Sequence, residues 1–218
     1  MHKPSLILGA ATALLLQGCQ TPPPAPPVVR EVVKQEAPNW RGEALPEDIG
    51  RIESVAAAWH SALDRARHAG FRRQIQAERK LLDDQVALPF PAPSPGSYMC
   101  RTIRFSAPGA RTRAFLGFKP FFCYVGADGD KLYLAKQTGS DRPSGYLWKA
   151  DNDTSLIFLG SISRGETEPP IPYGSDRARD LAGLFQRIGP LRFRLVLPRE
   201  HGALDILELV PAAVQNDE

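Results

Sequence analysis

The chain has 218 residues, of which 43% are hydrophobic and 23% are charged, and its formal net charge is +3. This length and apolar content suit a folded domain and exclude a wholly disordered chain. The 27 basic and 24 acidic residues nearly balance, so no excess of positive charge points to nucleic acid, and we do not expect it as a partner. The 21 prolines and the odd number of cysteines, three, require an explanation.

Residues 1–18 have the pattern of an export signal. A lysine near the start is followed by the uncharged apolar segment 6–16, which is too short to span a bilayer. Residues 16–19 read LQGC, which resembles the lipobox of bacterial lipoproteins. The resemblance implies cleavage before Cys19, a lipid anchor on its sulfur and an acyl chain such as palmitate on the new amino end. The alternatives are an ordinary signal peptide with an unrelated cysteine, or a chance apolar N-terminus. Because Gln20 follows the cysteine where Asp favours inner-membrane retention, we expect anchoring to the outer membrane, facing the periplasm.

A proline-rich tether is expected over residues 19–45. Residues 21–27 read TPPPAPP, and such runs favour extended polyproline II at about 3.1 Å per residue. Directly after a lipidated cysteine, this segment is interpreted as a spacer that lifts the folded part off the membrane. The alternative is a ligand for a proline-binding partner.

Residues 46–88 are predicted to form a helical hairpin. Pro46 is tolerated in the first turn of a helix, and Glu47 and Asp48 lie at the positive end of the helix dipole. The apolar residues that follow have helical spacing, and they are Ile52, Val55, Trp59, Leu63 and Ala66. Gly70 is expected to end this helix before a second one begins. A single longer, bent helix is the alternative.

A proline-rich connector over 89–96 leads into a β domain over 97–211, which a flexible tail over 212–218 follows. Seven runs rich in β-forming residues are predicted to be strands, at 98–105, 121–125, 131–137, 145–149, 156–162, 192–197 and 204–210. In the sixth run, Arg192 and Arg194 are expected to face solvent, while the residues that alternate with them face the core.

One helix is expected to interrupt these strands. Ser175 is a candidate N-cap, and Gly189 before a proline ends the segment. The apolar residues between them have helical spacing, and they are Leu181, Leu184, Phe185 and Ile188. The predicted fold is therefore α+β, with an N-terminal helical hairpin followed by a mainly antiparallel meander sheet or small β-barrel of about seven strands with one inserted helix.

The odd number of cysteines divides into one anchor and one pair. With Cys19 lipidated, Cys100 and Cys123 remain, each in a predicted strand of a chain bound for an oxidising compartment. Closing the loop between them contributes roughly 3–4 kcal/mol in the chain-entropy model. We predict a disulfide between them, and the alternative is a pair of buried free thiols.

Several short stretches follow one another in a recognisable order. They are LLD at 81–83, PGSYMCR at 95–101, KPFFC at 119–123, QTGSDRPSG at 137–145, YGSD at 173–176 with Arg179 and Asp180, and LDILEL at 204–209. Together they resemble the domain of unknown function 4893, an uncharacterised family of Gram-negative envelope proteins, over roughly residues 40–211. The resemblance implies no activity, cofactor or catalytic residue. Both Cys100 and Cys123 recur in the family's pattern, which fits their pairing.

The candidate contact site is the loop 138–145. Its Arg142 lies beside Ser140, Asp141 and two glycines, and a guanidinium among hydroxyls can clamp a carboxylate or phosphate. The alternative is a tight strand connection in which Arg142 braces a neighbouring segment. The sequence carries no nucleophile elbow, phosphate-binding loop, dinucleotide fingerprint or zinc-protease motif. We therefore expect no catalytic residue, metal or cofactor.

These observations favour a non-catalytic binding or structural module of the cell envelope, held at the membrane through Cys19. Its expected partner is an envelope protein, an envelope polymer or a small apolar ligand. The alternative is an envelope hydrolase with a dispersed active site, because a catalytic triad assembled by the fold leaves no local motif.

Overall fold

The computed structural model describes residues 39–213. The predicted export signal at 1–18, the predicted lipidation site at Cys19 and most of the predicted tether lie outside the described residues. So does all but the start of the predicted tail at 212–218. Within the described range, no helix combines the length and the apolar character that a membrane crossing requires.

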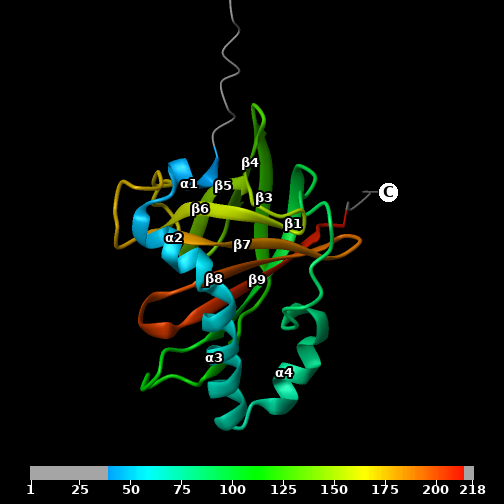
Figure 1. Cartoon of the computed structure of the whole chain (residues 1–218), viewed down its shortest axis with the longest axis vertical. Helices are drawn as coiled ribbons and strands as arrows, with labels where there is room; N and C mark the ends of the chain where they lie inside the picture. Colours follow the sequence, from blue (N-terminus) through cyan, green and yellow to red (C-terminus); the bar gives the residue numbers. More distant parts are fainter. Residues whose placement is uncertain (1–38, 214–218) are drawn as a thin grey trace, which may run out of the picture. The chain divides into compact units, whose positions relative to one another are not determined.

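Nine strands among the described residues form one antiparallel sheet (Figure 1). They are β1 (Gly96–Phe105), β2 (Phe115–Gly117), β3 (Phe121–Asp128), β4 (Lys131–Lys136), β5 (Asp141–Lys149), β6 (Ser155–Arg164), β7 (Asp180–Gly189), β8 (Arg192–Pro198) and β9 (Leu204–Pro211). Apart from β2, which pairs with β1, the strands lie side by side in chain order. β1 also pairs with β9, with Phe105 opposite Leu204 and Tyr98 opposite Pro211. Eight strands therefore close into a barrel, and β2 is an extra strand beside it.

The predicted inserted helix is wrong, because Asp180–Gly189 is the strand β7. Leu181 and Phe185 belong to the apolar interior of the barrel, whereas Ala182 and Ile188 lie on the opposite face, beneath the helices. Since both faces of β7 are buried, its apolar residues do not alternate with polar ones. The spacing of the apolar residues then matches a helix by coincidence.

Four short α-helices in the described residues precede the barrel. They are α1 (Trp40–Glu43), α2 (Pro46–Glu53), α3 (Val55–His68) and α4 (Arg72–Glu78), and a 3₁₀ turn over Arg79–Leu81 follows them. α2 packs on β7, and α3 packs on β1, β8 and β9, so the helices cover one side of the barrel (Figure 1). The α+β class is confirmed. Gly70 separates α3 from α4, and its φ of 90° lies in the left-handed region that glycine adopts readily.

The predicted helical stripe is buried against the barrel. Its members on α3 pack over the outer face of the strands, and they are Val55, Trp59, Leu63 and Ala66. Ile52 belongs to a second cluster with Trp40 and Trp148. Because Trp40 is only 3% exposed, the packed part of the chain begins within the segment predicted as tether, before Pro46.

Arg194 on β8 is fully buried, so its predicted exposure to solvent is wrong. Its guanidinium lies 4.4 Å from the ring centroid of Trp59 on α3. It donates hydrogen bonds to the side-chain oxygen of Gln186 at 2.9 Å and to the main-chain oxygen of Asp83 at 2.5 Å. Burial lowers the pKa of Arg194 to about 10. The helices cover this face of β8, and the arginine fixes the turn after α4 to the barrel.

Cys100 of β1 and Cys123 of β3 form the predicted disulfide, with their Cα atoms 6.0 Å apart. Both sulfurs lie inside the barrel, within its apolar core. The crosslink therefore joins two adjacent strands and marks which face of each strand points inward.

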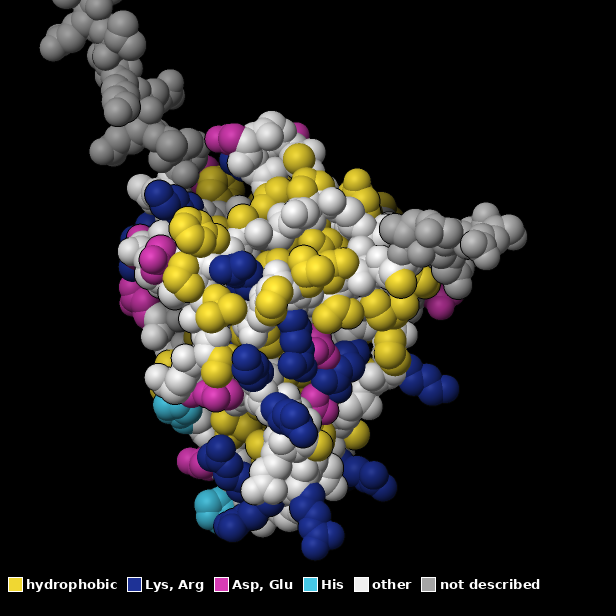
Figure 2. Space-filling view, turned by 90° about the vertical axis from the view of Figure 1, so that its right-hand side faces the viewer, with side chains coloured by type: hydrophobic (Ala, Val, Ile, Leu, Met, Phe, Trp, Pro, Cys, Tyr) yellow, Lys and Arg dark blue, Asp and Glu magenta, His cyan; other side chains and the backbone are white. Residues whose placement is uncertain are grey.

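The outer face of β3 carries exposed aromatic residues. Phe122 and Tyr124 flank the inward-facing Cys123 and are 47% and 42% exposed. Figure 2 shows the molecule from the right-hand side of Figure 1, and hydrophobic side chains gather there in the upper part, above a group of Lys and Arg. The helices thus leave the outer face of β3 uncovered at these two residues.

Candidate functional site

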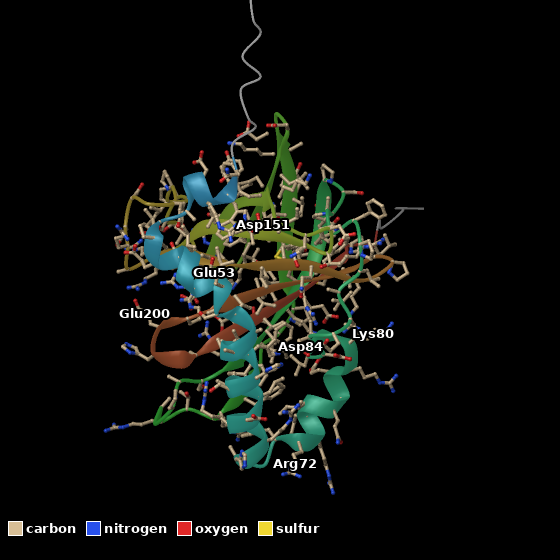
Figure 3. All side chains as sticks on the ribbon, viewed as in Figure 1. Glu53, Arg72, Lys80, Asp84, Asp151 and Glu200 are labelled. Atoms are coloured by element: carbon tan, nitrogen blue, oxygen red, sulfur yellow. A yellow bond between two sulfur atoms is a disulfide. The ribbon has the colours of Figure 1, made fainter. Side chains whose placement is uncertain are left out.

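One end of the barrel, which we call the mouth, carries its longest connections. Here β1, β4, β6 and β8 end, and β3, β5, β7 and β9 begin. The connecting segments are 106–120, 137–140, 165–179 and 199–203. In Figure 3, Glu200 marks the connection between β8 and β9. Loops carried on a rigid scaffold are frequent places for binding residues.

The inward-facing residues closest to the mouth are charged. Side chains alternate between the two faces of a strand, and Cys100 and Cys123 point inward. Arg104, four residues after Cys100 on β1, therefore points inward too, and so does Asp205, which pairs with Arg104 from β9. Lys136 on β4 pairs with Cys123 and shares its face. The charged side chains gathered here are Arg104, Lys136, Asp141, Arg199 and Asp205, together with the exposed Lys119.

These charged residues surround a cavity of about 470 Å³. Its floor is apolar and consists of Pro143, Ile162, Leu197 and Leu207. Phe118 and Phe121 lie at its rim, and the hydroxyls of Thr102, Thr138 and Ser140 also face it. Its volume falls within the range of about 300–1,000 Å³ that is typical of small-molecule sites.

Beneath this floor the barrel is filled. Phe158, Phe185, Leu195 and Leu209 are all fully buried in the interior cluster. Phe185 stacks on Phe193, with ring centroids 5.7 Å apart. The cavity therefore ends one layer of side chains below the charged residues.

Arg104 and Asp205 form a two-point ion pair at the edge of the cavity. Nε and Nη2 of Arg104 donate to Oδ1 and Oδ2 of Asp205 at 2.6 and 2.8 Å. These hydrogen bonds are the main cause of the raised pKa of Arg104. Asp205 is only 4% exposed, so the pair is held in a low-dielectric setting where it is hard to break. Arg104 therefore has a fixed position, and most of its charge is compensated.

Arg199 and Lys136 are compensated less well. Nε of Arg199 lies 3.9 Å from Oδ2 of Asp205, an oxygen that Arg104 already occupies. The described residues place no carboxylate within 4 Å of Nζ of Lys136, which lies 4.2 Å from the ring centroid of Phe121. Burial lowers the pKa of both Arg199 and Lys136, because few negative charges replace the water that their charged forms lose. The mouth therefore holds a small excess of positive charge.

The structure separates the three residues of the predicted contact site. Ser140 and Asp141 line the cavity, and Asp141 lies 3.9 Å from Nη2 of Arg104. The side chain of Arg142, the next residue along β5, points to the opposite face of the strand, away from the cavity. It donates to the main-chain oxygens of Gly165, at 3.0 Å, and of Glu168. Arg142 thus braces the connection between β6 and β7, which is the alternative given for it above.

The residues that sequence reasoning missed come from three different strands and a loop. Arg104, Lys136, Arg199 and Asp205 have no common motif, and only closure of the barrel brings β1 next to β9. One signal does exist for Arg104, because it lies at even spacing from Cys100 on a predicted strand. If the disulfide sulfur points to the core, this arginine points to the same side.

A second hollow of about 310 Å³ adjoins the mouth near α2. Three of the arginines that line it are paired with acids. Arg51 lies 2.7 Å from Asp48, Arg177 pairs with Glu47, and Arg179 pairs with Glu168. Asp48 also accepts a 2.5 Å hydrogen bond from the hydroxyl of Tyr173. These contacts fasten α2 to the connection between β6 and β7.

A groove of about 480 Å³ between α3 and α4 contains a histidine–carboxylate pair, His60 Nε2 and Asp84 Oδ2 at 2.6 Å. Asp84 is visible on the segment after α4 in Figure 3. The described residues that line this groove include no Ser, Thr or Cys to act as a nucleophile beside the pair. Within residues 39–213 there is also no group of three or more His, Cys, Asp and Glu that could hold a metal ion.

The fold and the cavity define a small closed β-barrel with a helical cover and a charged mouth. The family model of the domain of unknown function DUF4893 matches residues 40–209, and the chain belongs to this family. The resemblance drawn from the short sequence stretches is thereby confirmed. No curated protein and no solved structure matches the chain.

Proposed function

We propose that the chain is a non-catalytic binding module of the bacterial cell envelope and that the barrel mouth holds a small ligand. The observation that carries this proposal is the cavity of about 470 Å³, with an apolar floor and a few convergent polar side chains. That combination is the general form of a small-molecule site. The walls of the cavity are strands of a closed barrel crosslinked by Cys100 and Cys123, so the site exists before a ligand arrives.

The envelope location rests on the sequence of the N-terminal segment. We propose that Cys19 carries the lipid anchor and that the folded part faces the periplasm from the outer membrane. The disulfide is consistent with this location, because such bonds persist in oxidising compartments. Metabolic labelling with a radioactive fatty acid tests the anchor. Label is expected in the natural chain and absent from a Cys19→Ala variant, and label in that variant contradicts the assignment.

A neutral fluorescent probe, N-phenyl-1-naphthylamine, tests the binding module. The full chain is placed in lipid nanodiscs, and empty nanodiscs give the background. We expect saturable fluorescence that Thr102→Phe abolishes, because the larger side chain fills the cavity from β1. Thr154→Phe, at the other end of the barrel, is the control and is expected to leave binding unchanged. Equal fluorescence of Thr102→Phe and the natural chain contradicts the proposal.

One observation favours an envelope hydrolase as a second candidate. The hydroxyl of Ser140 and the amine of Lys136 line the same cavity, and burial lowers the pKa of Lys136. A lysine with a lowered pKa can serve as the base for a serine nucleophile. Hydrolysis of p-nitrophenyl butyrate that disappears in both Ser140→Ala and Lys136→Met supports this candidate. Absence of hydrolysis by the natural chain leaves the binding module.

A further inference from the structure

We infer that the mouth is built for a carboxylate that carries a short apolar tail. This inference rests on the proposed binding function and names the class of ligand. It combines three features of the same cavity, namely its charge, the layering of its side chains and its depth. Each feature excludes a different kind of molecule.

The charge of the cavity selects an anion. The inward-facing cations are Arg104, Lys136 and Arg199, and the inward-facing carboxylates are Asp141 and Asp205. The exposed Lys119 also lines the cavity, so positive charge is in excess. A carboxylate reduces this excess, whereas a cationic ligand increases it.

Two of the three inward-facing cations have donors to spare. Arg104 donates from Nε and Nη2 to Asp205, so these two donors are already occupied. Arg199 only approaches that carboxylate, at 3.9 Å, and the described residues give Lys136 no carboxylate within 4 Å. Arg199, directly after β8, and Lys136, at the end of β4, line the same cavity. Together they offer donors to the two oxygens of one carboxylate, and charge-assisted hydrogen bonds of this kind are the strong ones.

The apolar floor accepts a tail. Ile162, Leu197 and Leu207 lie beneath the charged layer and face the cavity. A ligand whose charged head meets the cations therefore places its other end on these side chains. Burial contributes about 0.8 kcal/mol for each methylene, so affinity is expected to rise about fourfold for each CH₂ that reaches the floor.

The filled interior limits the length of that tail. Leu195 and Leu209, the next inward-facing residues on β8 and β9, are fully buried and leave no opening below the floor. Successive inward-facing layers are about 7 Å apart along a strand, so the tail has only about one such layer to occupy. A long-chain fatty acid does not fit this depth, and a medium-chain acid does.

Equilibrium dialysis of radiolabelled octanoate against the full chain in nanodiscs tests the inference, with empty nanodiscs as the blank. We expect octanoate to bind at least tenfold more tightly than 1-octanol, which has the same tail without the charge. Inorganic phosphate and butanoate are expected to bind more weakly than octanoate, because they lack a tail or have a shorter one. Hexadecanoate is expected to gain nothing over octanoate after correction for its uptake by the nanodiscs.

Two charge variants identify the cations. Lys136→Met and Arg199→Gln are each expected to weaken octanoate at least tenfold while leaving the affinity for 1-octanol within twofold. Lys149→Met is the matched control, since Lys149 is exposed at the opposite end of β5 and is expected to change neither affinity. Tm values of the variants, measured alongside, show whether each one is folded. If one of the two does not fold, the other carries the test.

The outcomes separate this inference from the proposed function. Equal affinities for octanoate and 1-octanol, or unchanged octanoate affinity in both folded variants, overturn the carboxylate and leave the binding module in place. Phosphate that binds as well as octanoate overturns the role of the tail. If neither octanoate nor the neutral probe binds, the inference and the proposed function both fail.

Discussion

Replacing Arg194 by Ala is expected to destabilise the protein severely. The substitution removes a fully buried guanidinium, its hydrogen bond to Gln186 and its hydrogen bonds to three main-chain oxygens in the segment after α4, one of which is that of Asp83. A buried hydrogen bond to a charged group contributes about 1.5–3 kcal/mol. The guanidinium shares its donors among the carbonyls, so we count the equivalent of two such bonds. The contact with Trp59 adds about 0.5–2 kcal/mol.

Burying the charged guanidinium is itself unfavourable, and the alanine variant avoids this cost, so part of the loss is offset. We therefore expect the free energy of unfolding to fall by about 3–5 kcal/mol, a large fraction of the 5–15 kcal/mol that is typical of a domain. Arg194→Met keeps much of the packing volume and is expected to lose only about 1–3 kcal/mol.

Urea unfolding followed by tryptophan fluorescence measures both variants, because Trp59 lies against the arginine. Arg192→Ala is the control. Arg192 lies on the same strand and pairs with Glu208. Arg192 is partly exposed and Glu208 keeps its second partner, Arg101, when Arg192 is removed, so the loss is expected to be about 1 kcal/mol or less. If Arg194→Ala unfolds within about 0.5 kcal/mol of the natural chain, the reasoning about the buried arginine is refuted.

Three further predictions concern the crosslink, the brace and the mouth. Replacing both Cys100 and Cys123 by Ala is expected to lower the free energy of unfolding by roughly 3–4 kcal/mol, measured in urea. The variant has no such crosslink to reduce, so the effect of reductant on it is the baseline. A loss on substitution that is no greater than this baseline contradicts the crosslink. Arg142→Ala is expected to speed tryptic cleavage within 165–179 without changing octanoate affinity, and a tenfold loss of affinity would instead make this arginine a ligand contact. Octanoate affinity is expected to fall as the pH rises through the lowered pKa of Lys136, because binding requires its charged form; an affinity that is flat up to pH 11 contradicts this role.

The parts of the fold that the sequence reveals are those where one face of an element meets water or a turn residue marks its end. The reversal at Gly70 and the hairpin between β3 and β4, with Gly129 at a φ of 61°, have local signals of this kind. β7 has none, because helices cover one face and the barrel core fills the other. A polar residue can also be buried on such a strand, as Arg194 is, and the alternation rule then assigns it to the wrong environment.

The candidate site was predictable only where it is local. Ser140 and Asp141 belong to one unusual loop, and both line the cavity. Arg104 and Asp205 are 101 residues apart, and they become a pair only through the register between β1 and β9. No period or motif within a single segment encodes that register, because it results from closure of the whole barrel.

The pairing of β1 with β9 also determines when the protein can finish folding. The earliest strand of the barrel has the latest one as its neighbour, and α3 likewise packs on β8 and β9. During synthesis, the apolar side of α3 and one edge of β1 stay exposed until β9, Leu204–Pro211, has been made. A chain cut before that strand keeps two open edges, on β1 and β8, which other chains can join. Such a fragment is expected to aggregate or be degraded rather than survive as a weakened binding module.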